Sequence, residues 1–194
     1  MGRRFFNMAV SLLIFLATVP LLLIAAIAIK IEDRGPVLYR QFRVGYKGVE
    51  FRLIKLRTMA VGAEHQGSGY AVNKGDPRIT AVGRILRRTS LDELPQIWNV
   101  IRGEMNLVGP RPTLLYQVDR YTPHQRIRLE VKPGITGWAQ VHGRAALPWD
   151  KRIELDIWYV EHQSLLLDLL ILVRTPLALF RDTYKGKAGG WNVR

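Results

Sequence analysis

Two adjacent carboxylates, Asp92 and Glu93, lie at a corner between two helical patterns and are the strongest candidates for chemistry in this sequence. Apolar residues recur at helical spacing on both sides of the corner, and Gly103 ends the second helix. The second helix can begin with a capping box of Ser90 and Glu93, or with Asp92 as its cap. Either start places Asp92 at a helix N-terminus, where exposed N–H groups favour an anion and keep a carboxylate ionised.

Three arginines, Arg84, Arg87 and Arg88, share one face of the first helix. Like charges on one helix face repel each other unless an anion lies close to them. A carboxylate pair beside these cations therefore suits chemistry on a phosphorylated substrate. Taken alone, however, the corner is more simply explained by acidic residues that complement a helix dipole and by a solvated arginine face.

Composition narrows the partners and the sites that this chain can form. Its 194 residues suffice for one domain with a substantial core. The chain has no cysteine, which excludes disulfides and thiolate chemistry, and its four histidines are too scattered to favour a zinc site. A net charge of +13 indicates an anionic partner, which is a nucleic acid, an anionic lipid or a phosphorylated substrate.

Residues 5–29 carry no charge and form a run that is long enough to cross a bilayer core of ~30 Å. The run is too long for the apolar part of a signal peptide, and Lys30 follows it at once. Arg3, Arg4 and the strongly basic remainder of the chain all favour the cytoplasm. A straight helix cannot place both of its ends there.

Pro20 lies near the middle of this run, where it removes one backbone hydrogen bond and bends a helix. Thr18 is placed to bond the freed carbonyls. A bent helix that enters the membrane and returns on the same side satisfies both charge preferences, whereas an ordinary span with a tolerated proline satisfies only one. The residues alone leave both arrangements open. Residues 165–180 are apolar but interrupted by charge, which indicates a helix in the membrane interface or one packed on the core.

The chain between these apolar segments predicts elements that can position further cations. Residues 37–44 and 49–56 are typical of the two strands of a hairpin, and Lys55 and Arg57 close its second strand. Residues 62–78 are rich in glycine and polar residues, and they predict a mobile loop of the kind that can cover a site.

Further along, two prolines fix the backbone on either side of Arg111, which prepares its side chain to bind a phosphate or a base. Residues 113–131 predict a charged helix. A Pro-Gly turn follows, with Gly134 at positive φ, and then residues 140–144 are expected in extended form, Arg144 among them. Residues 149–161 predict an amphipathic helix.

The chain resembles a small monotopic phosphoglycosyl transferase of the bacterial sugar transferase family. The resemblance covers nearly the whole chain and rests on sequence blocks that occur in the same order. These blocks are the apolar run with Pro20, Lys55-Leu56-Arg57-Thr58-Met59, Asp76-Pro77-Arg78-Ile79-Thr80, Ser90-Leu91-Asp92-Glu93-Leu94-Pro95-Gln96, Leu107-Val108-Gly109-Pro110-Arg111-Pro112 and Pro133-Gly134-Ile135-Thr136-Gly137. Together they are far more specific than any one block alone. No multi-span region precedes them, which is typical of the minimal members.

This resemblance implies that a sugar 1-phosphate moves from a UDP-sugar to polyprenol (undecaprenyl) phosphate and that UMP is released. It implies that Asp92 attacks the β-phosphorus, that a covalent aspartyl phosphosugar forms, and that the lipid phosphate then resolves it. It also implies Mg²⁺ held by Asp92 and Glu93, with Glu93 either a metal ligand or a base. A phospholipid bilayer is implied as a further partner, through a re-entrant helix broken at Pro20.

Several basic residues are candidates for contacts to such a substrate. Arg87 and Arg88 lie one turn before Asp92 and suit the diphosphate. Weaker candidates for phosphate or uridine contacts are Lys55, Arg57, Arg111 and Arg144.

The fold expected from these observations is a mixed α/β, mainly helical, single membrane-associated domain. Residues 1–31 would form the re-entrant membrane helix. Residues 32–194 would form the catalytic domain, with a β-hairpin and amphipathic interfacial helices, on the cytoplasmic face of a bacterial inner membrane. A non-enzymatic, membrane-anchored basic adaptor is the alternative. A nucleic-acid binder is disfavoured because the sequence has no recognition-helix or aromatic-basic signature. The sequence does not identify the sugar, the polyprenol length, the pathway or the oligomeric state, a homodimer included.

Overall fold

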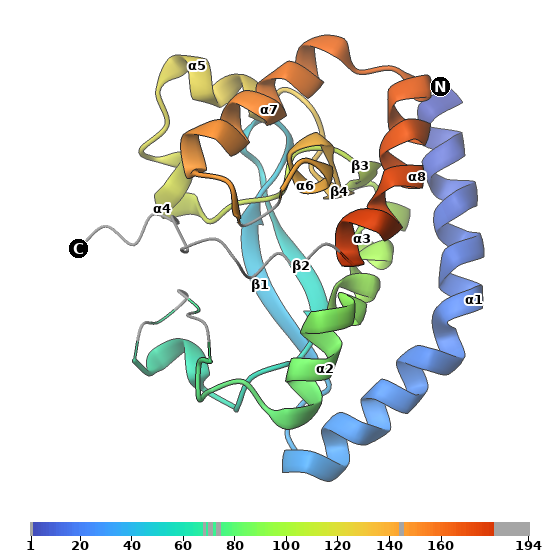
Figure 1. Cartoon of the computed structure of the whole chain (residues 1–194), viewed down its shortest axis with the longest axis vertical. Helices are drawn as coiled ribbons and strands as arrows, with labels where there is room; N and C mark the ends of the chain where they lie inside the picture. Colours follow the sequence, from blue (N-terminus) through green and yellow to red (C-terminus); the bar gives the residue numbers. More distant parts are fainter. Residues whose placement is uncertain (1, 68, 70–71, 73–74, 144–145, 181–194) are drawn as a thin grey trace.

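A long N-terminal helix, α1 (Gly2–Asp33), lies beside a β-hairpin and a series of shorter helices (Figure 1). The computed structural model describes residues 2–67, 69, 72, 75–143 and 146–180. The other helices, some of them single 3-10 turns, are η1 (Tyr46–Gly48), η2 (Ala63–His65), α2 (Ala81–Thr89), η3 (Leu91–Gln96), α3 (Ile97–Ile101), α4 (Leu115–Val118), α5 (Pro123–Arg126), η4 (Ile127–Leu129), α6 (Trp138–Val141), α7 (Trp149–His162) and α8 (Leu165–Phe180). The mixed, mainly helical α/β class is thus confirmed, together with the apolar N-terminal helix and the hairpin.

The hairpin pairs β1 (Leu38–Val44) with β2 (Glu50–Leu56) in antiparallel register, close to the strands expected from the sequence. The inward face of β1 carries polar side chains. Gln41 is buried and Arg43 is half-buried on this face, whereas Phe42 points outward and is exposed. Apolar residues ordinarily occupy the inward face of such a strand, so this reversed pattern indicates that β1 contributes to a site.

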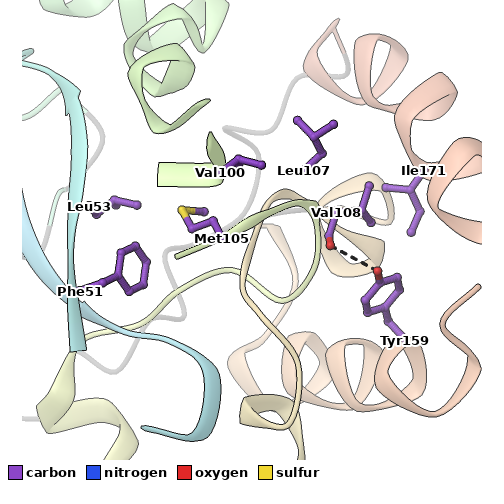
Figure 2. Close-up of a cluster of buried hydrophobic side chains, with 8 residues drawn as sticks. All are labelled: Phe51, Leu53, Val100, Met105, Leu107, Val108, Tyr159 and Ile171. Carbon is purple, nitrogen blue, oxygen red and sulfur yellow. Dashed lines mark hydrogen bonds between the residues drawn. The ribbon is translucent and has the colours of Figure 1, made fainter. Parts of the chain in front are cut away.

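The largest apolar cluster joins the hairpin to the helices beside it (Figure 2). Its buried members are Phe51, Leu53, Val100, Met105, Leu107, Val108, Tyr159 and Ile171. The Tyr159 hydroxyl lies in hydrogen-bond contact with the Val108 carbonyl oxygen, at 3.3 Å. Burial of these side chains removes a large apolar area from water and fixes β3 (Asn106–Val108) between the hairpin and the C-terminal helices.

The second sheet pairs β3 in parallel with β4 (Gly134–Thr136). Its two backbones touch at glycines, because a Cβ atom on Gly134 would lie only 2.1 Å from the backbone nitrogen of Gly109. Gly134 is the first residue of β4 and does not have a positive φ. The expected left-handed turn at Gly134 is therefore wrong, and close backbone approach is what requires glycine here.

Two other expectations of secondary structure are wrong in detail. Residues 113–131 form the three short helices α4, α5 and η4 instead of one charged helix, because Thr122 caps a new helix that begins at Pro123. Residues 138–141 form α6, where the sequence suggested an extended segment from residue 140. The amphipathic helix expected at 149–161 is confirmed as α7.

A polar stripe on the N-terminal half of α1 contacts the rest of the molecule. Arg3, Asn7 and Ser11 recur every four residues and therefore share one face. Arg3 forms a 2.6 Å ion pair with the buried Asp168 of α8. The Asn7 side-chain oxygen accepts a 2.7 Å hydrogen bond from the backbone N–H of Leu107 in β3. The start of α1 is thus held against the domain that carries the hairpin and the corner.

Two acidic side chains hold the C-terminal end of α1. The Glu32 carboxylate accepts a 2.6 Å hydrogen bond from the backbone N–H of Ala81, at the start of α2. Asp33 forms an ion pair with the buried Arg57, directly after β2. Both contacts reach the elements that lead into the corner, so the end of α1 and the corner are mechanically connected.

The part of α1 between these ends is apolar and mostly exposed. Of the described residues, this helix alone is long and apolar enough to cross a membrane. It stays helical through Pro20 and changes direction along its length (Figure 1). The Thr18 hydroxyl donates to the carbonyl oxygen of Ile14 at 2.8 Å, whereas the carbonyl that Pro20 leaves without its helical partner belongs to Leu16. The expectation that Thr18 compensates for the proline is therefore wrong.

Candidate active site

The structure contains the corner expected from the sequence, but its second helix begins as the 3-10 helix η3 and lacks the side-chain cap that the sequence suggested. Ser90 follows α2 in the left-handed conformation, with φ of 56°. Asp92 and Glu93 occupy the first turn of the 3-10 helix η3, and the Ser90 side chain does not cap it. Both expected caps are therefore wrong, although Asp92 does lie in the N-terminal turn of a helix.

Asp92 is buried, with 8% of its surface exposed. Loss of water around the carboxylate raises its pKa to about 6, and the negative charge of Glu93 acts in the same direction. The positive charges of Lys55, Arg87 and Arg111 oppose this rise. Burial therefore outweighs the helix N-terminus, which alone would have kept the pKa low, and the carboxylate is still mostly ionised at neutral pH.

Arg111 holds Glu93 in a bidentate contact. Its two terminal nitrogens donate to the two carboxylate oxygens, at 3.1 and 2.5 Å. The negative charge of Glu93 raises the pKa of Arg111, so that this side chain stays charged. Half of the Arg111 side chain is exposed. The proline-flanked arginine expected from the sequence is thus brought to the carboxylate pair.

A buried ion pair fixes the backbone of Arg111. Arg128 and Asp156 pair with each other, and their side chains are only 4% and 3% exposed. Arg128 also donates a 3.0 Å hydrogen bond to the carbonyl oxygen of Arg111. Sequence patterns alone did not predict this pair. Its signal was an acidic residue within the apolar stripe of α7, three positions after Ile153.

A cleft opens beside the corner, between the inward face of the hairpin and the loop that follows it. Its polar lining includes Gln41, Arg43, Lys55, Arg57 and Arg87. Loop residues Ala63, Glu64, Gly69 and Val72 line the other side. The segment that the sequence suggested as the cover of a site therefore forms one wall of this cleft.

Lys55 lines the cleft, and its charge interacts with that of Asp92. Burial lowers the pKa of its ammonium group to about 8, and the charges of Arg43 and Arg87 act in the same direction, while Asp92 opposes them. Its nitrogen lies 5.3 Å from the centre of the Tyr39 ring. This cation is thus poorly hydrated and close to other cations, which favours binding of an anion.

The structure separates the remaining cations suggested by the sequence. Arg87 lines the cleft, whereas Arg88 lies on the exposed side of α2. Arg57 also lines the cleft, but its guanidinium group forms an ion pair with Asp33. Arg57 therefore helps to hold the end of α1. Arg144 lies outside the described residues.

Arg78 is a further positioning residue, which the sequence analysis quoted only as part of a block. Its guanidinium group pairs with Asp76 at 2.7 Å. It also donates to the carbonyl oxygens of Ala63, Gln66 and Gly69 at 2.7–2.8 Å. These carbonyls belong to the loop wall of the cleft, so Arg78 determines the shape of that wall.

The corner offers some of the ligands that a divalent cation needs. Asp92 and Glu93 supply carboxylate oxygens, which Mg²⁺ prefers. No group of three or more histidine, cysteine or acidic side chains that could hold a metal gathers in the described part of the chain. Mg²⁺ commonly binds through one or two carboxylates plus substrate phosphates, so these two residues would fit a magnesium ion whose remaining ligands include the oxygens of a bound phosphate.

Comparison with known proteins shows extensive similarity. A family model described as Bacterial sugar transferase matches residues 1–182. Uncharacterized sugar transferase EpsL of Bacillus subtilis is 41% identical over 173 residues, which cover 89% of this chain and 84% of that protein. UDP-glucose:undecaprenyl-phosphate glucose-1-phosphate transferase of Caulobacter vibrioides is 43% identical over 185 residues, 91% of this chain and 69% of that protein.

A longer relative matches only through part of its length. UDP-N-acetylgalactosamine-undecaprenyl-phosphate N-acetylgalactosaminephosphotransferase of Aeromonas hydrophila is 46% identical over 162 residues. These residues cover 80% of this chain but 38% of that protein, so the chain spans well under half of that relative.

The raised pKa of Asp92 predicts a pH-dependent effect of Asp92→Asn on stability. The native state holds the Asp92 proton up to about pH 6, whereas the ordinary value is 3.8, so the wild-type protein loses stability as the pH rises through this interval. Asparagine carries no charge at any pH, so the variant does not lose stability in this interval. The variant should therefore gain on the order of 2–3 kcal/mol in free energy of unfolding at neutral pH. Thermal unfolding at several pH values measures the gain, which should vanish below pH 3.8.

Asp119→Asn is the matched control, because Asp119 is exposed. This variant should show no gain that grows with pH. A gain for Asp92→Asn that is the same at every pH would contradict the raised pKa.

Proposed function

This chain belongs to the bacterial sugar transferase family, and we propose that it is a phosphoglycosyl transferase that moves a sugar 1-phosphate from a UDP-sugar to undecaprenyl phosphate and releases UMP. Relatives named for this kind of transfer, from Caulobacter vibrioides and Aeromonas hydrophila, support the two substrate classes. The observation that carries the proposal is the buried carboxylate of Asp92 beside the cations Lys55, Arg87 and Arg111.

Asp92 suits the role of nucleophile. Its carboxylate oxygen attacks the β-phosphorus, the bond from that phosphorus to the bridging oxygen breaks, and UMP leaves with that oxygen. The product is a covalent aspartyl phosphosugar. Because Asp92 is buried, little water has to be removed before it reaches the phosphorus. Lys55, Arg87 and Arg111 offset the repulsion between the carboxylate and the anionic diphosphate.

The second transfer regenerates Asp92. An oxygen of undecaprenyl phosphate attacks the phosphorus of the intermediate, and Asp92 leaves as a carboxylate. The product is a polyprenyl-diphosphate-linked sugar. Glu93 keeps Arg111 next to the reacting phosphorus through its bidentate contact, so the same cation serves both transfers.

Magnesium is part of this proposal. Asp92 and Glu93 would hold Mg²⁺ together with phosphate oxygens, and the bound ion would neutralise charge on the transferred phosphoryl group. Lys55 and Arg87 bind the anionic donor from the side of the cleft. Arg111 binds it from the proline-flanked loop.

We infer further that α1 enters the membrane from the cytoplasmic face of a bacterial inner membrane and returns to the same side. Contacts at both of its ends support this inference, since Arg3 pairs with Asp168 of α8 and Asp33 pairs with Arg57. A spanning helix would carry its N-terminus across a core of ~30 Å, away from a domain with many charged residues. The exposed apolar middle of α1 would lie in lipid, and Asp92 would meet the lipid phosphate at headgroup depth.

Asp92→Asn should abolish transfer while leaving the fold intact. The amide keeps the size of the side chain but cannot act as the anionic nucleophile. The measurement is UMP release from a panel of UDP-sugars, with undecaprenyl phosphate and Mg²⁺, for both proteins. Substantial UMP release by the variant would show that Asp92 is not the nucleophile, and no release by the wild-type protein from any UDP-sugar would contradict the proposed function.

Arg87 and Arg88 should differ in their effect on transfer, although they are neighbours in the sequence. Arg87→Ala should lower kcat/KM by more than about tenfold, because it removes a cation that lines the cleft and acts on Asp92. Arg88→Ala should have a much smaller effect, because Arg88 lies on the exposed side of α2. Steady-state kinetics of the two variants measure the difference, and equal losses would mean that the cleft does not bind the donor.

The topology of α1 can be measured with a single cysteine, because the chain has none of its own. A cysteine at Gly2 should react with a membrane-impermeant reagent only after the cytoplasmic side is opened. Pro20→Leu should straighten α1 and move part of the population across the membrane, with a parallel loss of transfer.

Asp119→Cys, on the exposed surface of the domain, is the control and should be labelled from the cytoplasmic side in both backgrounds. If the cysteine at position 2 is labelled from the periplasmic side while Pro20 is intact, α1 crosses the membrane as an ordinary span and the re-entrant arrangement is wrong.

A further inference from the structure

Arg43, on the inward face of β1, is a cation that the transfer mechanism above leaves unused. Its guanidinium group donates to the side-chain oxygen of Gln41 at 2.6 Å and lies 3.5 Å from the carbonyl oxygen of Pro112. Its Nε atom is buried and has no hydrogen-bond partner. None of the ion pairs found among the described residues includes Arg43.

Arg43 is also close to other cations. Burial lowers its pKa to about 10, and the positive charge of Arg111 acts in the same direction. The charge of Arg43 in turn lowers the pKa of Lys55. Buried like charges that lack their own acidic partners are costly, unless a ligand supplies the anion. This arrangement therefore favours a bound anion beside Arg43.

The position of Arg43 indicates which anion this is. Arg43, Gln41 and Lys55 all line the cleft, whereas Asp92 and Arg111 are absent from its described lining. In the proposed reaction the phosphorus lies at Asp92, and the nucleotide would extend from there into the cleft. Arg43 would then lie on the side of the phosphate that carries the nucleoside.

We propose that Arg43 binds the phosphate group of the donor that departs with the nucleoside, and that Gln41 orients its guanidinium group toward that phosphate. This inference rests on the proposed function. When Asp92 attacks, the electron pair of the broken phosphorus–oxygen bond stays on the bridging oxygen, which becomes part of the UMP phosphate. No proton moves in this step. A guanidinium group beside that oxygen stabilises the charge that develops on it.

Titration of the full-length protein with UMP, followed by calorimetry, tests this role without any turnover. Arg43→Gln should weaken UMP binding by more than about tenfold. Arg40→Gln is the matched control, because Arg40 lies on the exposed face of the same strand, and it should bind UMP as the wild-type protein does. Arg43→Lys should keep part of the UMP affinity, because lysine retains the positive charge but lacks the planar guanidinium group and its paired N–H donors.

The two half-reactions distinguish this role from a general effect on folding. Without lipid, Arg43→Gln should release UMP from a UDP-sugar more slowly, by a factor similar to its loss of UMP affinity. Discharge of the preloaded aspartyl phosphosugar onto undecaprenyl phosphate should keep the wild-type rate, because UMP has already left.

Four outcomes would contradict one proposal or both. Wild-type UMP affinity in Arg43→Gln, or equal losses in both half-reactions, would overturn the role of Arg43. A wild-type protein that binds UMP but transfers from no UDP-sugar would contradict the proposed function alone, and the UMP titrations would still decide on Arg43. A wild-type protein that does not bind UMP would overturn both.

Discussion

The candidate active site depends on keeping the carboxylate of Asp92 out of water and close to cations. Burial raises its pKa, and the charges of Lys55, Arg87 and Arg111 limit that rise to about 6. The result is a carboxylate that is ionised at neutral pH but weakly hydrated. Such a group can approach a diphosphate at a lower cost than a solvated carboxylate, because its water has already been removed during folding.

The elements around the corner maintain this balance of burial and charge. Gly83 allows α2 to pack directly on the backbone of Thr58, because a Cβ atom there would lie 2.0 Å from the Thr58 carbonyl oxygen. The buried pair of Arg128 and Asp156 fixes the loop that presents Arg111. At the end of α1, Glu32 accepts a hydrogen bond from the first backbone N–H of α2, and Asp33 holds the chain after β2 through its ion pair with Arg57. The long helix α1 and the cations of the site are therefore linked through short, charged contacts.

The sequence predicted the elements of this fold better than the contacts between them. Periodicity and turn residues were enough for the hairpin and for α7. They could not show that Arg57 pairs with Asp33, because the two are 24 positions apart and meet only in the tertiary structure. Spacing likewise placed Arg87 and Arg88 together, while packing of α2 turns only Arg87 toward the cleft. Arg43 had a readable signal, since polar residues alternate into the inward face of β1, where apolar ones are usual.

Under the proposed mechanism, Asp92 becomes covalently bonded to the sugar phosphate before the lipid takes part. The most direct measurement is mass spectrometry of the wild-type protein after incubation with a UDP-sugar and Mg²⁺ in the absence of undecaprenyl phosphate. Our account predicts a gain equal to one sugar phosphate, located on the peptide that contains Asp92, with one UMP released for each adduct. A protein that stays unmodified, and releases UMP only when the lipid phosphate is present, would show direct transfer and contradict the account.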